Sequence, residues 1–201
     1  MRKHCKYIKI FLLSFFVIAD SALFGQPNHE DSVHYFEYLK VITAFGNDSI
    51  KGKKIPGFTC KDIKGSLLTD KNLQSKITFV NFWFETCAPC IAEFGALEKF
   101  YQNNKANAEF QFVSITFETD SIIDGIRKKY GLTYPIYQLS SDSCRKVIRG
   151  LGYPTNFIVN ENIEIVYYLT GGSTNPVVAD KFLNYFVQTE LDKHLKLKTV
   201  K

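Results

Sequence analysis

The chain has 201 residues, and its 45% hydrophobic content, with 18 Phe and 11 Tyr, excludes an intrinsically disordered protein and fits one domain with extensions. The formal net charge of +5 falls to +2 without residues 1–25, because 21 basic and 19 acidic residues then remain. No basic stripe interleaved with aromatic residues is left, so we expect no nucleic-acid partner.

The first 25 residues have the three-part pattern of a secretory signal peptide. A basic segment, MRKHCKYIK, precedes the apolar run IFLLSFFVIA and the small residues of DSALFGQ, which suit cleavage after Ser21 or Gly25. From Ile8 to Ala19 the apolar run is shorter than the roughly 20 residues that span a bilayer. We therefore predict that residues 1–25 are removed and that the mature protein is soluble and exported, for instance to the periplasm. The alternative is an uncleaved N-terminal signal anchor that tethers it.

Residues 26–52 are predicted to be an N-terminal extension of unknown role, and residues 53–201 the folded domain. Within the extension, DSVHYFEYLKVITAF has the pattern of a short helix that begins at Asp31 or Ser32. The next segment, IPGFTCKDIKGSLLTD, alternates apolar and polar residues around DIKG. This alternation predicts a β-hairpin over residues 55–70.

The rest of the chain alternates between strand and helix patterns. The continuous apolar runs KITFVNFWF and EFQFVSITF are typical of strands buried on both faces. Three segments are predicted helices, the second opened by Ser121 and stopped by Gly131: residues 88–104, 121–131 and 141–150. Two strands joined by a tight turn, residues 155–160 and 164–170, precede a closing helix over 175–195. This order predicts an α/β sandwich with a central mixed β-sheet flanked by helices.

Two cysteines lie where the first buried strand meets its helix. Cys87 is at the junction and Cys90 is one helical turn later, so both lie on one face, with Pro89 tolerated in the first turn. Unpaired N–H groups and the positive end of the helix dipole favour a thiolate there. The spacing therefore predicts a nucleophilic and a resolving thiol that can close a reversible disulfide. The alternatives are a structural disulfide and half of a zinc site, although two further ligands at regular spacing are missing.

Three motifs, NFWFETCAPCIAEF, YPTNFIVN and LTGGSTNP, together resemble the TlpA/ResA branch of exported thioredoxin-like thiol:disulfide oxidoreductases. The resemblance covers about residues 54–190. It implies a thioredoxin-like sandwich in which the hairpin is an N-terminal addition. It also implies dithiol–disulfide exchange, with no metal and no organic cofactor.

The resemblance further implies roles for single residues. Cys87 would be the attacking thiol and Cys90 the more buried resolving thiol of one redox-active disulfide. Glu93 would be a buried carboxylate with a raised pKa that exchanges a proton with Cys90, the alternative being an exposed residue of the first helical turn. Four residues are expected at the substrate-binding surface, one of them a cis-proline: Trp83, Tyr153, Pro154 and Thr155. For Trp83 the alternative is plain core, and for Pro154 an ordinary trans loop proline.

One position departs from the family pattern, because Thr86, preceded by Glu85, replaces the Trp that commonly comes before the first cysteine. This leaves the redox potential and the substrate open. The resemblance favours a disulfide reductant of exported proteins such as apocytochrome c, recycled by a membrane thiol electron donor. The alternatives are an oxidant or isomerase of the same fold, a thiol peroxidase and a non-catalytic binding module. A peroxidase is disfavoured, because Phe84 stands three residues before Cys87 where such enzymes have Thr.

Two further cysteines have no role in this scheme. Cys60 shares the face of Phe58 in the strand alternation and is expected to be a buried, inert thiol. A Cys60–Cys144 disulfide is the alternative. The four histidines fall in the leader, the extension or the C-terminal tail, so we expect no histidine base or metal ligand: His4, His29, His34 and His194.

Overall fold

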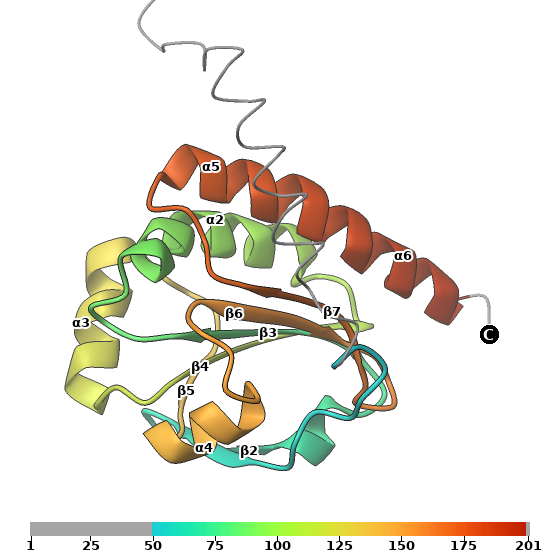
Figure 1. Cartoon of the computed structure of the whole chain (residues 1–201), viewed down its shortest axis with the longest axis horizontal. Coiled ribbons are helices and arrows are strands. Elements are labelled where there is room, and N and C mark those ends of the chain that lie inside the picture. Colours follow the sequence, from blue (N-terminus) through green and yellow to red (C-terminus); the bar gives the residue numbers. More distant parts are fainter. Residues whose placement is uncertain (1–49, 200–201) are drawn as a thin grey trace, which may run out of the picture.

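The computed structural model describes residues 50–199. The predicted signal peptide and the predicted helix that follows it lie outside these residues. Figure 1 shows the sheet between two layers of helices, with α2, α5 and α6 over one face and α4 over the other. The predicted α/β sandwich with a mixed sheet is confirmed.

The sheet has seven strands in the order β2-β1-β5-β4-β3-β6-β7. The strands are β1 Thr59–Asp62, β2 Leu67–Thr69, β3 Ile77–Trp83, β4 Phe110–Thr116, β5 Ile136–Gln138, β6 Thr155–Val159 and β7 Ile165–Thr170. The helical elements are η1 Asp70–Leu73, α2 Ala88–Asn104, α3 Asp120–Tyr130, α4 Ser141–Val147, α5 Pro176–Lys181, η2 Phe182–Val187 and α6 Gln188–Thr199.

The central strand is β3, in which every residue is buried. It pairs in parallel with β4 and antiparallel with β6. Since successive side chains of a strand point to opposite faces, β3 contributes to two separate cores. Phe79 packs under α2 against Phe100, at 4.9 Å between ring centroids, whereas Phe82 packs on the α4 side against Phe157, at 5.9 Å.

The predicted hairpin is confirmed as β1 and β2, which pair antiparallel around Gly65, a residue with φ of 84°. Asp62 Oδ1 accepts hydrogen bonds from the backbone N–H groups of Lys64 and Ser66, which stabilises this turn. The hairpin joins the sheet through antiparallel pairing of β1 with β5. The strand β5 itself was not predicted, because three residues are too few to show a period.

Two helix boundaries, in α3 and α4, differ from the prediction. Thr119, not Ser121, caps the start of α3, and its Oγ1 accepts a hydrogen bond from the N–H of Ile122. The helix α4 ends at Val147 instead of continuing to residue 150. The reason is that Arg149 and Gly150 have left-handed φ angles of 55° and 74°, which cannot continue a right-handed helix.

The predicted closing helix is longer than expected and consists of three segments. Asn175 caps α5, and its Oδ1 accepts a hydrogen bond of 2.9 Å from the N–H of Val177. A π-helical segment, η2, then joins α5 to α6, which continues to Thr199. Leu183, Val187 and Leu191 are fully buried, so this unit closes the core over α2. Within residues 50–199, no helix combines the length and apolar character needed to cross a membrane.

The first described residues lie along the edge strand β7. Ile50 is buried, and the N–H of Gly52 donates to the carbonyl of Ile165 at 2.8 Å. The N–H of Ile165 in turn donates a hydrogen bond of 2.9 Å to the carbonyl of Lys53. A further bridge pairs Lys54 with Glu164. These residues therefore cover the start of β7.

Candidate functional site

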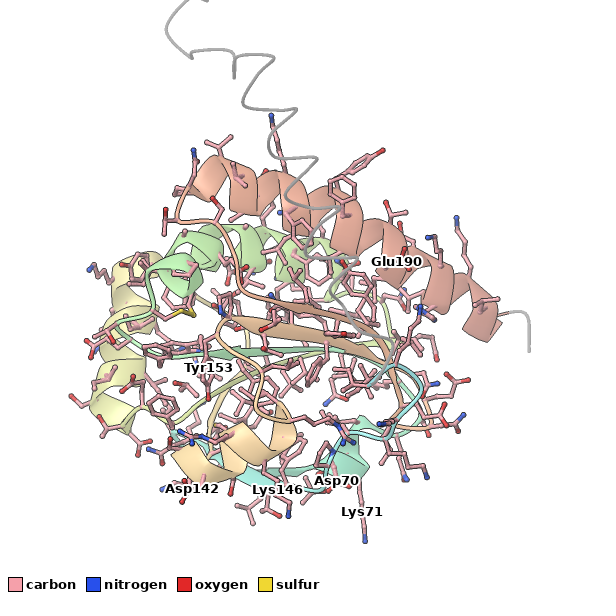
Figure 2. The ribbon with its side chains drawn as sticks, in the orientation of Figure 1. Asp70, Lys71, Asp142, Lys146, Tyr153 and Glu190 are labelled. Carbon is pink, nitrogen blue, oxygen red and sulfur yellow. A yellow bond between two sulfur atoms is a disulfide. The ribbon has the colours of Figure 1, made fainter. Side chains whose placement is uncertain are left out.

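The cysteine pair lies at the N-terminus of α2, directly after the central strand. Cys87 is the N-cap residue of this helix, and its Sγ accepts a hydrogen bond of 3.3 Å from the N–H of Cys90. The two residues form a disulfide with their Cα atoms 5.2 Å apart, visible as the yellow bond at the start of α2 in Figure 2. On reduction, the same helix N-terminus presents N–H donors and a positive dipole end to the sulfur, which favours a thiolate.

The loop before β6 contains a cis peptide bond between Tyr153 and Pro154. The alternative of a trans proline is therefore wrong. Thr155 Oγ1 donates a hydrogen bond of 2.6 Å to the carbonyl of Gly152, and the N–H of Gly171 donates to the carbonyl of Pro154 at 2.8 Å. These contacts hold the cis-proline loop against the end of β7.

Gly172 is the point at which the three sequence motifs meet. A Cβ atom at this position would lie 2.9 Å from Glu93 Oε1, 3.3 Å from Pro154 Cγ and 3.5 Å from Pro89 Cβ. A side chain there would displace at least one of these groups. The motif LTGGSTNP marks this segment in the sequence, but nothing in the motif indicates which glycine requires the space.

Glu93 is buried, with 2% of its surface exposed. The alternative of an exposed first-turn carboxylate is therefore wrong. Burial raises the pKa of Glu93 to about 8, and the hydrogen bond from Asn156 Nδ2 to Glu93 Oε2, at 3.3 Å, opposes this rise only in part. The carboxyl group is therefore largely protonated at neutral pH, and it can both accept and release a proton at a pH close to neutral.

A chain of buried hydrogen bonds leads from the indole of Trp83 to Glu93. Trp83 Nε1 donates to Ser114 Oγ at 2.8 Å, and Ser114 Oγ donates to Asn81 Oδ1 at 3.2 Å. Asn81 Nδ2 donates to Asn156 Oδ1 at 2.8 Å. Because its oxygen is occupied in this way, the Asn156 amide presents its NH₂ group to the Glu93 carboxyl. No motif in the sequence marks Asn81, Ser114 or Asn156, which are buried polar residues inside apolar strands.

Trp83 and Thr155 do not reach the surface, since both side chains are fully buried. Trp83 packs edge-to-face on Phe94, at 5.1 Å between ring centroids. The indole thus supports α2 from below, and the hydroxyl of Thr155 holds the loop. The expectation that Trp83 and Thr155 lie at the substrate-binding surface is therefore wrong for their side chains, which support the site from within the core.

Tyr153 remains partly exposed, and its ring contacts that of Phe84 edge-to-face at 5.2 Å. Burial raises the pKa of its phenol to about 12, so the hydroxyl stays protonated at physiological pH. Among the residues expected at the substrate-binding surface, Tyr153 is thus one whose side chain is partly exposed. Figure 2 shows Tyr153 below the disulfide, on the side of the sheet that faces α4.

The segment that precedes Cys87 is hydrogen-bonded to Glu118, which follows the end of β4. Glu118 Oε1 accepts a hydrogen bond of 2.8 Å from the N–H of Glu85. Glu85 and Thr86 are both exposed. The position where the family pattern has Trp is therefore a small hydroxyl side chain at the protein surface, beside two carboxylates.

Cys60 and Cys144 are free thiols on the opposite face of the sheet. Both are buried, as expected for Cys60, and the alternative disulfide between them is not formed. Burial raises the pKa of each thiol to about 12. Among residues 50–199, no group of three or more His, Cys, Asp or Glu side chains is arranged to hold a metal ion.

Comparison with known sequences relates the chain to one group of proteins. A family model described as Redoxin matches residues 50–183. The thiol-disulfide oxidoreductase ResA of Halalkalibacterium halodurans is 30% identical over 132 residues, which cover 64% of this chain and 73% of that protein. ResA of Bacillus subtilis is 28% identical over 140 residues, covering 67% of this chain and 76% of the relative.

Solved structures share the fold. A thiol:disulfide interchange protein from Bacteroides sp. superposes with a TM-score of 0.55 at 22% identity, covering 67% of this chain and 90% of that one. The thioredoxin domain of a thiol-disulfide oxidoreductase from Bacteroides vulgatus has a TM-score of 0.55 at 22% identity, covering 68% and 97% of the two chains. These matches confirm the predicted thioredoxin-like sandwich.

Proposed function

Because the chain belongs to the Redoxin family and is a thiol-disulfide oxidoreductase of the ResA type, we propose that it works outside the cytosol as a reductant of disulfides in exported proteins. The observation that carries this proposal is the Cys87–Cys90 disulfide at the N-terminus of α2, beside the cis-proline loop and the buried Glu93. The pattern of residues 1–25 supports export.

The first step of the proposed reaction is attack by the Cys87 thiolate on one sulfur of a substrate disulfide. The Cys87–substrate S–S bond forms while the substrate S–S bond breaks, and the second substrate sulfur leaves as a thiolate that takes a proton from water. The peptide N–H of Cys90 remains within hydrogen-bonding reach of Cys87 Sγ. This donor and the helix dipole stabilise the attacking thiolate.

The second step resolves the mixed disulfide. Cys90 loses its proton to the carboxylate form of Glu93 and attacks Cys87 Sγ, so the substrate's bound sulfur leaves as a thiolate. The substrate gains two electrons in total, and the protein ends with the Cys87–Cys90 disulfide. A base with a pKa near that of a thiol suits this transfer, and burial raises the pKa of Glu93 to about 8.

The proposed substrates are exported proteins whose cysteines must be reduced, such as apocytochrome c. A reductant of this kind needs a source of two electrons per cycle, and we propose a membrane thiol donor for that role. The partly exposed Tyr153, next to the cis-proline, offers its backbone to an extended substrate segment. No metal or organic cofactor takes part in these steps.

The direction of electron flow is tested by the reduction potential of the Cys87–Cys90 pair, in protein that lacks residues 1–25 and carries Cys60→Ala and Cys144→Ala. Equilibration with defined thiol buffers is expected to give a value near or below about −270 mV, as for thioredoxin. A value of about −120 to −180 mV would instead identify an oxidant or isomerase. If no reversible couple appears, the pair is structural and the proposal fails.

A further inference from the structure

A cavity of about 470 Å³ opens beside the cis-proline loop on the α4 side of the sheet. We call it the α4 pocket and define it by six lining residues: Phe117, Ser141, Arg145, Ile148, Leu151 and Tyr153. Its volume is within the range of about 300–1,000 Å³ that is usual for small-ligand sites. It can therefore hold one or more side chains of a bound polypeptide.

Tyr153 connects the α4 pocket to the cysteine pair through Phe84. Tyr153 forms one wall, and it is also the residue directly before Pro154. Its ring contacts Phe84, whose carbonyl accepts a hydrogen bond from the N–H of Cys87 at 3.2 Å. Figure 2 shows Tyr153 between the disulfide and α4. A polypeptide that crosses the cis-proline loop with its cysteine at Cys87 would therefore bring a neighbouring residue to this pocket.

The walls of the α4 pocket combine an apolar surface with one cation. The rings of Phe117 and Tyr153 meet edge-to-face at 6.0 Å, and Ile148 and Leu151 add aliphatic surface. Arg145 is the single charged residue of the lining. Among the residues that the structure describes, no carboxylate forms an ion pair with Arg145. A guanidinium group is geometrically matched to a carboxylate, and an apolar wall suits the methylene groups that carry one.

We propose that the α4 pocket receives an acidic side chain, Glu or Asp, that lies near the disulfide cysteine of the substrate protein. This inference rests on the proposed function and adds a sequence preference to it. The carboxylate pairs with Arg145, while the stem of the side chain lies on Phe117 and Tyr153. Exported proteins with an acidic residue beside the cysteine are then the preferred substrates.

The test uses three disulfide-linked peptides that are identical except for one residue next to the cysteine, which is Glu, Gln or Lys. Reduced protein is mixed with each peptide at low ionic strength, and the second-order rate of disulfide reduction is measured. We expect the Glu peptide to react about fivefold faster than the Lys peptide, the upper end for a partly exposed ion pair. Added salt should reduce this ratio, because it screens exposed charges.

The variant Arg145→Glu should reverse the preference, so that the Lys peptide reacts faster. Lys146→Glu is the matched control, since it makes the same charge change one residue along the same helix. Figure 2 shows the Lys146 side chain on the outer side of α4, away from Tyr153. This control should keep the Glu preference within twofold of the unmodified protein. Equal rates for the Glu and Lys peptides, or an unchanged ratio in Arg145→Glu, would overturn the proposed pocket.

Reduction of bis(2-hydroxyethyl) disulfide, a small substrate without charge, separates the two proposals. Lys146→Glu should reduce it at the rate of the unmodified protein, because this residue lies outside the lining of the α4 pocket. If this disulfide is reduced and the peptides are not distinguished, the α4 pocket is refuted while the oxidoreductase function stands. If this disulfide and the peptides all fail to react, the proposed function fails as well.

Discussion

The two faces of the β-sheet each hold a pair of cysteines, and the two pairs are almost equally buried. Cys87 and Cys90 are 5% and 1% exposed, and Cys60 and Cys144 are 2% and 0% exposed. One pair forms a disulfide and the other consists of free thiols. Burial alone therefore does not separate a redox pair from inert thiols.

The backbone groups that meet each sulfur make the difference. Cys87 Sγ accepts a hydrogen bond from a backbone N–H, at the positive end of a helix of 17 residues. Cys60 Sγ instead donates to the carbonyl of Leu68 at 3.5 Å, and Cys144 Sγ donates to the carbonyl of Leu139 at 3.7 Å. An N–H donor stabilises a thiolate, whereas a carbonyl acceptor stabilises the neutral thiol. The two pairs thus differ in the backbone group that meets the sulfur, an N–H donor at Cys87 and a carbonyl acceptor at Cys60 and at Cys144.

The largest expected effect comes from exchanging sulfur for oxygen in each pair. Cys87→Ser should reduce the rate of disulfide reduction to the uncatalysed background, because a hydroxyl is not deprotonated at neutral pH and cannot form the mixed disulfide. Cys60→Ser and Cys144→Ser should keep the rate of the unmodified protein. An assay with a peptide disulfide measures both. Loss of activity in Cys60→Ser, with its fold intact by circular dichroism, would contradict the assigned division of roles.

Alkylation of the reduced protein compares the reactivity of the two pairs of thiols directly. Burial raises the pKa of Cys60 and Cys144 from 9.0 to about 12, so at pH 8 their thiolate fraction is about a thousandfold lower than that of an ordinary cysteine. Iodoacetamide followed by mass spectrometry should therefore label Cys87 first and leave Cys60 and Cys144 unmodified. Labelling in urea should reach Cys60 and Cys144 as well as Cys87 and Cys90. Rapid labelling of Cys60 in the folded protein would show that the opposite face is not closed to water.

A third prediction concerns the close packing around Gly172, near the redox pair. Gly172→Ala places a methyl group 2.9 Å from Glu93 Oε1 and should lower the free energy of unfolding by about 1–3 kcal/mol, as for other overpacked sites. Gly95→Ala is the control, because no atom lies within 4 Å of a Cβ there and the exposed helical position favours alanine by about 0.8–1 kcal/mol. Urea denaturation measures both. Equal stability of the two variants would mean that Gly172 is not closely packed.

The smallest expected effect is a pH dependence of the free energy of unfolding, caused by Glu93. Burial raises its pKa from 4.5 to about 8, so between these values the folded protein binds a proton that the unfolded chain does not. Stability should therefore fall as pH rises, by about 1.4 kcal/mol per unit, and become constant above pH 8. Urea denaturation of the oxidised protein between pH 7 and 8 stays above 6.5, the ordinary pKa of histidine, and burial lowers the pKa of His194 further in the folded protein.

The variant Glu93→Gln removes this titrating group and should have nearly constant stability across the same range. A slope equal to that of the unmodified protein would show that Glu93 is already charged in the folded state. Because Cys87 and Cys90 are joined in the oxidised form, neither contributes to the slope.

Most of the fold followed from the sequence, because long runs carry strong patterns. The helix over residues 88–104 was predicted to the residue, and the buried strands on either side of it were found within one residue. Those segments are set by continuous apolar runs and a proline in the first helical turn. The strand β5 and the π-helical segment η2 were missed, because pairing and packing create them and local composition does not.

The site was predictable only where a residue type is itself a signal. Cys87, Cys90 and Pro154 stand in recognisable motifs, and the structure contains a Cys87–Cys90 disulfide and a cis peptide bond before Pro154. Asn156 and Gly172 were missed because their importance lies in contacts between distant parts of the chain. Asn156 is 63 residues from Glu93 and yet hydrogen-bonds to it.

The two edge strands of the sheet differ in how their backbone is protected from pairing with another chain. The outer strand β2 has only three residues, and residues 52–54 pair with the start of β7 at the other edge. A long free edge would offer a row of unpaired amides to a second copy of the chain. With one edge this short and the other partly covered, the sheet offers little template for intermolecular strand addition.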